Sequence, residues 1–260
     1  MNAAGTEPAR SAAPIARHIG TRIRLAAAFL TILPVAPSAQ ADPADVAASY
    51  GWFPLVGFFI GAALCVFDRA LAPVLNPSLR SILVIAALAA VTGAVHLDGL
   101  ADAADALGAG RDRARSLEIL RDSRIGSFGA IALIFILTLK FVALATAASA
   151  NRGAALILAP GLGRWAMVAV ARGLDYLRPS GAGSGLLTET NGRNLRVATI
   201  IALAGVAIFA VRRPLAAIIV AAAIAYALRA LYRRWLGGIT GDLIGAAGEI
   251  VETAVLIVLS

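Results

Sequence analysis

The stretch SILVIAALAAVTGAVHLDGLADAADALG, residues 81–108, decides the fold class, because a long apolar run passes directly into a run with three aspartates. The apolar part, Ser81–Leu97, has nearly the length that crosses a hydrocarbon core of about 30 Å as a helix. Comparable apolar runs occur at Gly51–Phe67, Gly129–Ser149, Ala154–Ala171, Leu195–Val211, Leu215–Leu231 and Leu243–Leu259. The pattern predicts an all-α, polytopic integral membrane protein, a single bundle of about six to eight transmembrane helices.

The composition of the chain agrees with a membrane protein. Of its 260 residues, 60% are hydrophobic and 15% are charged, whereas about 25% of residues are charged in soluble domains. These proportions exclude a disordered chain, a coiled coil, a collagen-like rod and an ordinary soluble enzyme. Cys65 is the only cysteine, which excludes an internal disulfide and a cysteine-ligated zinc site.

The chain divides into a short tail and one domain. Residues 1–18 are polar and rich in Ala and Pro, so we predict a disordered N-terminal tail. Residues 19–260 are predicted to form a single transmembrane catalytic domain. Its first part, Ile19–Val35, is short and carries arginines near its start, which indicates an interfacial or partly inserted segment. Gly57 and Gly61 form a small-xxx-small pair, which favours close contact between two helices.

The positive charges predict the orientation of the bundle. The chain has a net charge of +8, but its arginines are scattered at the ends of apolar runs and therefore do not indicate nucleic-acid binding. Because cytoplasmic connectors are enriched in Arg and Lys, we place the N-terminus and the connectors 98–128, 172–196 and 232–242 in the cytoplasm. The pair Arg212–Arg213 falls on the other side and is an exception to this rule.

Three aspartates follow the second apolar run at helical spacing. Asp98, Asp102 and Asp105 occupy positions i, i+4 and i+7, so a helix would place them on one face. Such a stripe repels itself, and Mg²⁺ would neutralise it and leave water positions open for a phosphate ligand. Two such ions about 4 Å apart can clamp the oxygens of a phosphoryl transfer. The alternative is a solvated helix face.

A second polar segment, ILRDSRIGSFG, covers residues 119–129. Asp122 could complete a metal shell, and Arg121 and Arg124 could hold a phosphate, since guanidinium is the bidentate partner of phosphate oxygens. The alternative makes these arginines anchors of the positive-inside type that pair with Glu118 and Asp122.

A third polar segment, GGITGDLIGAAGEIVE, covers residues 237–252. Asp242, Glu249 and Glu252 share one face of the last predicted helix. Ionisable groups within an apolar segment are expensive and usually functional. The predicted orientation brings this segment to the side of the aspartate stripe, which favours a metal site. The alternative is a proton or cation path in a transporter.

Four further residues are weaker candidates. His96 could be a general base or ligand, or a hydrogen-bonded structural group. Arg164 is either a ligand of a substrate phosphate or the partner of a buried carboxylate, and Lys140 is expected to face the protein interior. Arg178 lies in a polar loop, residues 176–183, which is either a substrate-gripping lid or a simple turn.

The motifs HLDGLADAADALG, LRDSRIGSFG and GGITGDLIGAAGE resemble, in this order and at similar separations, the signatures of the adenosylcobinamide-GDP ribazoletransferase (cobalamin synthase) family. FLTILPVAPS and YGWFPLVGFFIGA resemble the N-terminal part of the same family, so the resemblance extends from about residue 25 to the end of the chain.

The resemblance implies a multi-pass enzyme of the bacterial inner membrane with its active site facing the cytoplasm. It would join adenosylcobinamide-GDP to α-ribazole or its 5′-phosphate in the last step of cobalamin assembly, release GMP and depend on Mg²⁺. Further expected partners are membrane lipid and either more copies of the chain or other cobalamin-assembly enzymes. The resemblance assigns catalysis to Asp98, Asp102, Asp105 and Asp122, metal binding to these four with Asp242 and Glu249, to which Glu252 could be added, and charge compensation to Arg121 and Arg124. Of the weaker candidates, we place His96, Arg164 and Arg178 on the substrate.

Two other functions stay open at this point. A CDP-alcohol phosphotransferase-like enzyme also uses aspartates on helices with Mg²⁺, but its usual D-x2-D-G-x2-A-R and G-x3-D-x3-D spacing is absent from the sequence. An ion-coupled transporter would use buried carboxylates and is expected to show inverted repeats, which the sequence does not display.

Overall fold

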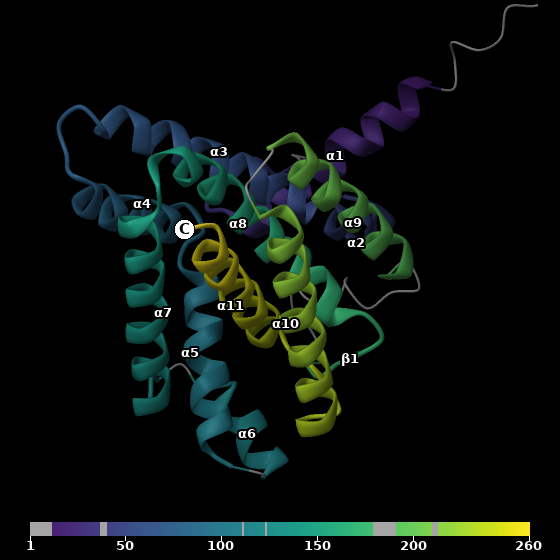
Figure 1. Ribbon diagram of the computed structural model, residues 1–260. Coiled ribbons are helices and arrows are strands. Elements are labelled where there is room, and N and C mark those ends of the chain that lie inside the picture. Colours follow the sequence, from purple (N-terminus) through teal and green to yellow (C-terminus); the bar gives the residue numbers. More distant parts are fainter. Residues whose placement is uncertain (1–11, 37–40, 111, 123, 179–190, 210–212) are drawn as a thin grey trace, which may run out of the picture.

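The structure, a computed structural model, describes residues 12–36, 41–110, 112–122, 124–178, 191–209 and 213–260. Helices make up nearly all of it (Figure 1). Two short parallel strands, β1 (Asp175–Tyr176) and β2 (Gly238–Ile239), pair with each other. The all-α prediction is confirmed. The helices are α1 (Ala12–Leu30), α2 (Pro43–Ser49), the 3₁₀ helix η1 (Tyr50–Trp52), α3 (Phe53–Leu71), α4 (Pro77–Val91), α5 (Val95–Gly108), α6 (Arg113–Ile119), α7 (Ser127–Thr146), α8 (Ser149–Ala171), α9 (Asn191–Ile208), α10 (Pro214–Trp235) and α11 (Gly241–Leu259).

The N-terminal helix begins earlier than the sequence predicted. Residues 12–18, which we placed in a disordered tail, form the first part of α1, and residues 1–11 lie outside the described part of the chain. His18 Nδ1 and Arg22 Nε both contact the Asp45 carboxylate, at 2.8 and 2.7 Å. These contacts attach α1 to α2.

Four helical segments in the described part of the chain are long and apolar enough to cross a membrane: Pro43–Leu71, α7, α8 and α10. A fifth arises if α4 and α5, which meet at 90°, count as one broken span. This number is lower than the predicted six to eight. The apolar runs that we predicted as membrane spans in α9 and α11 are helical, but neither belongs to the segments named above. Helix α11 carries three carboxylates.

The bend between α4 and α5 interrupts the run that we predicted as one continuous helix, Ser81–Leu97. Gly93 and Ala94 adopt left-handed backbone conformations with φ of 62° and 54°. A left-handed residue cannot continue a right-handed helix, so the chain turns at this point. The bend gives the aspartate stripe its own helix.

Helix α8 forms the centre of the bundle and packs against α3, α9, α10 and α11 (Figure 1). Its contact with α3 depends on the predicted small-residue pair. A Cβ atom at Gly57 would lie 2.5 Å from the Pro160 carbonyl oxygen, and one at Gly61 would collide with the Leu156 carbonyl. Only glycine allows the two backbones to approach this closely. The predicted close helix contact is confirmed.

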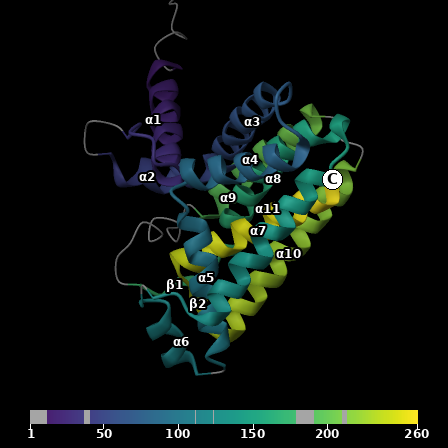
Figure 2. The same cartoon turned by 90° about the vertical axis from the view of Figure 1, so that its left-hand side faces the viewer.

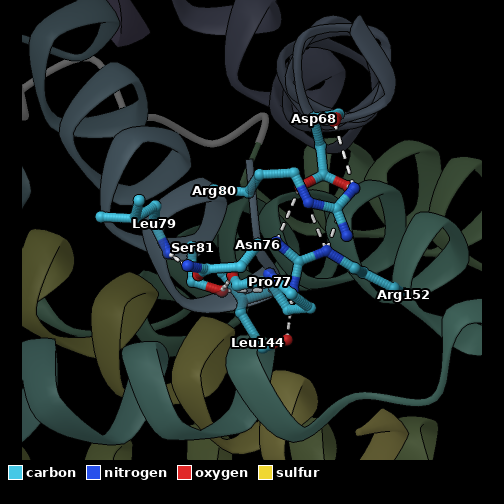
Figure 3. A network of polar contacts seen from close by, with 8 residues as sticks. All are labelled: Asp68, Asn76, Pro77, Leu79, Arg80, Ser81, Leu144 and Arg152. Carbon is cyan, nitrogen blue, oxygen red and sulfur yellow. Dashed lines mark hydrogen bonds and ion pairs between the residues drawn. The ribbon is translucent and has the colours of Figure 1, made fainter. Parts of the chain in front are cut away.

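A buried ion-pair network joins four helices at the N-terminal end of α8 (Figure 3). Arg152 Nη2 donates to Asp68 Oδ1 at 2.7 Å and Arg80 Nη1 donates to Asp68 Oδ2 at 3.2 Å. Arg152 also donates to Ser81 Oγ and to the Leu144 carbonyl oxygen. The network therefore ties α3, α4 and α7 to α8.

The polar connectors gather at the opposite end of α8, about 30 Å away at 1.5 Å per residue. There β1 pairs with β2, and Arg113 Nε of α6 donates to the Leu236 carbonyl oxygen at 2.8 Å. Figure 2 shows α5, α6, β1 and β2 together at this end, away from α3 and α4. The described parts of the three connectors that we placed on one side thus do converge.

Candidate active site

The aspartate stripe lies on α5, as the spacing predicted. Asp98 is exposed, and Asp102 and Asp105 are half-buried. Helix α5 packs directly on the start of α11, where a Cβ atom at Gly99 would lie 2.8 Å from the Asp242 carbonyl oxygen. This close backbone approach brings Asp242 beside the stripe.

Asp98, Asp102 and Asp242, which we call the aspartate cluster, interact electrostatically with one another. Among the described residues one cation, Arg178, contacts the cluster: its Nη2 donates to Asp242 Oδ2 at 2.6 Å and to the Leu120 carbonyl oxygen at 2.5 Å. Three carboxylates with one arginine leave an excess of negative charge. This charge favours the binding of a cation, either alone or together with its ligand.

Asp105 faces the same region but already has partners for both oxygens. Its Oδ2 accepts from the Gly126 amide at 2.7 Å and its Oδ1 from the Gly129 amide at 2.9 Å. These amides lie at the N-terminus of α7, where a carboxylate satisfies otherwise unpaired donors. Asp105 thus caps α7, and it also interacts electrostatically with Asp102 of the aspartate cluster.

The segment before α7 shows the ion-pair alternative considered for it. Arg124 Nη2 donates to Asp122 Oδ2 at 2.7 Å on the protein surface. Hydrogen bonds from Arg124 lower the pKa of Asp122 below its usual value. Arg121 is exposed, and its guanidinium has no partner among the described residues. Arg121 is thus the arginine of this segment that is free to meet an anion.

Glu249 and Glu252 lie deeper in the bundle and pair with cations. Lys140 Nζ contacts Glu249 Oε2 and Glu252 Oε1, both at 2.5 Å, and Arg164 contacts Glu252 Oε2. Buried His96 lies within electrostatic range of Glu252. Two glutamates and two cations compensate each other, as buried charges must.

Several predicted site residues are therefore separate from the aspartate cluster. Glu249 lies two helical turns beyond Asp242 and contacts Lys140 instead of joining the aspartates. Arg164 is buried and pairs with Glu252, which matches the structural alternative for this arginine, and His96 is also buried. Arg178 does contact the cluster, although the rest of its predicted loop, residues 179–183, lies outside the described part of the chain.

Sequence reasoning missed the hydroxyl beside the cluster. Thr240 caps the N-terminus of α11, and its Oγ1 lies 3.2 Å from Asp242 Oδ2. A threonine directly before an apolar helical run is a recognisable N-cap signal and could have been found. The contacts of Arg178, by contrast, join residues distant in the sequence and leave no local signal.

The described residues contain no group of three or more His, Cys, Asp or Glu side chains already arranged around a metal position. Mg²⁺, however, is usually held by one or two carboxylates together with water and substrate phosphates. The aspartate cluster offers ligands of this kind, so its chemistry fits Mg²⁺ that arrives with a phosphate substrate.

Comparison with known proteins agrees with the motifs. Residues 22–260 match the profile of the family described as cobalamin-5-phosphate synthase. The chain belongs to this family. A protein named adenosylcobinamide-GDP ribazoletransferase from Syntrophobacter fumaroxidans is 40% identical over 244 residues, covering 92% of this chain and 96% of that protein. Proteins of the same name from Stutzerimonas stutzeri and Desulforamulus reducens are 41% and 35% identical and cover 91% of this chain and 96% and 95% of their own lengths.

No solved structure matches the chain significantly. Family membership makes the protein a transferase of cobalamin synthesis, and its apolar helices make it a membrane protein. The alternatives of a CDP-alcohol phosphotransferase and an ion-coupled transporter are set aside.

Proposed function

We propose that the aspartate cluster carries out the joining step of cobalamin assembly at the surface of the bacterial inner membrane, on the cytoplasmic side. The substrates are adenosylcobinamide-GDP and α-ribazole or its 5′-phosphate, and the products are adenosylcobalamin or its 5′-phosphate and GMP. The names of the relatives support the substrates. The arginine-rich connectors at the end that carries the cluster support the cytoplasmic side.

The observation that carries the proposal is the close approach of α5 to α11. It places Asp98 and Asp102 beside Asp242, and Arg178 adds a guanidinium to the same place. The carboxylates can bind a cation. This cation and the arginine would together offset the negative charge of the diphosphate oxygens.

The reaction replaces the phosphoanhydride bond to GMP by a phosphate ester bond to α-ribazole. The ribose hydroxyl oxygen of α-ribazole bonds to the phosphorus that carries cobinamide, and the bond from this phosphorus to the oxygen bridging to GMP breaks. The hydroxyl proton passes to a carboxylate. We assign this role to Asp102, because Asp242 is paired with Arg178 and Asp98 is exposed, whereas Asp102 is half-buried and has no hydrogen-bonding partner among the described residues.

Arginines and Mg²⁺ would offset the negative charge of the phosphates. Arg178 lies in the cluster, and Arg121 is exposed near it, so both can approach the GMP group as it leaves. Asp98 and Asp242 would hold Mg²⁺ together with water and the substrate phosphates, and Asp102 would stay free to accept the hydroxyl proton. When bound, the ion supplies a positive charge that favours attack on the phosphorus.

The proposal is tested by GMP release from the purified protein in liposomes. We expect release from adenosylcobinamide-GDP only when both α-ribazole and Mg²⁺ are present. Asp102→Asn should reduce the rate at least about a hundredfold, the usual contribution of a general base. Asp175→Asn is a matched control, because Asp175 is an exposed acid on β1 at the same end of the bundle. No release by folded wild-type protein would refute the function, and full activity of Asp102→Asn would refute the site.

A further inference from the structure

A basic cavity opens beside the C-terminal end of α8, apart from the aspartate cluster. It has a volume of about 670 Å³ and is lined by Arg172 after α8 and by Arg193 and Arg196 on the first turns of α9. None of the three guanidinium groups has an acidic or hydrogen-bonding partner among the described residues. Three unpaired cations around one cavity favour an anionic ligand.

A second, apolar cavity lies next to the basic one along α9. Thr199 lines both cavities, and the second, with a volume of about 60 Å³, is lined by residues of α8, α9 and α10. Its walls include Trp165 of α8, Leu203 of α9 and Ile218 of α10. Trp165 Nε1 donates to Thr199 Oγ1 at 3.0 Å, so this side chain marks the junction of the two cavities.

The apolar cavity lies next to an apolar outer surface. Ile200, which lines the basic cavity, is 68% exposed, and Leu203 is 49% exposed. In a membrane protein such side chains face lipid. A ligand that fills both cavities therefore has an anionic end at the arginines and an apolar part that continues into the bilayer.

We propose that these cavities bind an anionic phospholipid, with its phosphate at Arg172, Arg193 and Arg196, the start of an acyl chain at the apolar cavity, and the rest of the chain along the exposed apolar side chains of α9. Arginine pockets between helices at a membrane surface are suited to anionic headgroups. A soluble phosphate would use the arginines but leave the apolar cavity without an occupant. The apolar cavity and apolar outer surface beside the arginines therefore favour a lipid. The site is independent of the reaction proposed for the aspartate cluster.

Position supports a cytoplasmic-leaflet lipid. Arg172 is followed after two residues by β1, which pairs with β2 directly before α11. The basic cavity is thus at the end of the bundle that carries the aspartate cluster. The start of α9 is held in place by Asn194, whose Nδ2 donates to the Ala47 carbonyl oxygen at 2.7 Å. Arg193 and Arg196 therefore lie on a helix end that is held in place.

The test uses Trp165 as a reporter of acyl chains. The chain has three tryptophans, so Trp52→Phe with Trp235→Phe leaves Trp165 alone. This protein is reconstituted in phosphatidylcholine vesicles that contain a small fraction of brominated phosphatidylglycerol or, separately, brominated phosphatidylcholine. Bromine quenches tryptophan on contact. We expect the brominated anionic lipid to quench Trp165 at a fraction at least about tenfold lower than the brominated neutral lipid.

Charge variants identify the headgroup contacts. In the single-tryptophan background, Arg193→Gln with Arg196→Gln should abolish the preference for the anionic lipid, and lysine at both positions should retain most of it. Arg233→Gln with Arg234→Gln is the matched control: it removes two exposed arginines from the end of α10 and should leave the preference unchanged. The variants are compared only where size-exclusion profiles show folded protein.

Three results would overturn the proposal. Equal quenching by the two brominated lipids would show that the arginines select no headgroup. An equal loss of preference in the control pair would show attraction by general surface charge. Loss of the quenching on addition of millimolar inorganic phosphate would show a site for soluble phosphate instead of a lipid.

Discussion

Substitution of Gly99 by alanine tests whether the approach of α5 to α11 positions the active site. The added Cβ would lie 2.8 Å from the Asp242 carbonyl oxygen, whereas ordinary contacts begin at 3.4 Å. The two helices must therefore separate by at least about 0.6 Å (3.4 minus 2.8). This movement shifts Asp98 and Asp102 relative to Asp242.

The expected loss of activity exceeds the expected loss of stability. Overpacking costs about 1–3 kcal/mol, but alanine gains about 1 kcal/mol over glycine within a helix. The free energy of unfolding should therefore fall by only about 0–2 kcal/mol. A displacement of about 1 Å can reduce catalysis about a hundredfold, so we expect kcat for GMP release to fall about tenfold or more.

Both quantities are measured on the same liposome preparation, kcat by GMP release and stability by thermal unfolding. Gly20→Ala serves as the control, because a Cβ atom at Gly20 on α1 meets nothing within 4 Å. It should leave kcat unchanged and raise stability by up to about 1 kcal/mol, because alanine is favoured over glycine within a helix. A Gly99→Ala protein with kcat within a factor of two of wild type and an unchanged unfolding temperature would refute the reasoning, because α5 and α11 would then not be in close contact.

Further substitutions test the bundle and the other carboxylates. Gly61→Val should prevent α3 from packing on α8 and lower the yield of folded protein severalfold, measured by fluorescence-detected size exclusion. Lys140→Met should cost about 3–5 kcal/mol in a denaturation assay, because it leaves one of the two buried glutamates uncompensated. Combining it with Glu249→Gln should recover most of this loss, and no recovery would contradict the charge argument. Asp105→Asn should lower stability by about 1–3 kcal/mol and kcat much less than Asp102→Asn, since its oxygens cap α7; equal losses of kcat would instead indicate a metal ligand.

Helical periodicity predicted the parts of the site that depend on local sequence. The spacing of Asp98, Asp102 and Asp105 predicted one helix face, and α5 contains all three. The arginine pattern predicted that Asp242 enters on the same side, and Gly99 does contact it. Lys140 within an apolar run predicted an interior cation, and its side chain is buried.

Features that depend on tertiary contacts could not be predicted in this way. The turn at Gly93 and Ala94 interrupts an apolar pattern that continues on both sides, so hydropathy gave no sign of it. The strands β1 and β2 have two residues each and pair over a long separation in the sequence. The hydrogen bond from the Gly126 amide to Asp105 depends on tertiary contacts, which the spacing of residues along the chain does not specify.

The most direct test of the account is kcat for GMP release by Asp242→Asn in liposomes at saturating adenosylcobinamide-GDP, α-ribazole and Mg²⁺. Asp242 lies on a different helix from Asp98 and Asp102, so it matters to catalysis only if α5 and α11 form one site. The account predicts that kcat falls at least about a hundredfold while the protein keeps its wild-type unfolding temperature. A kcat within a factor of two of wild type would contradict it.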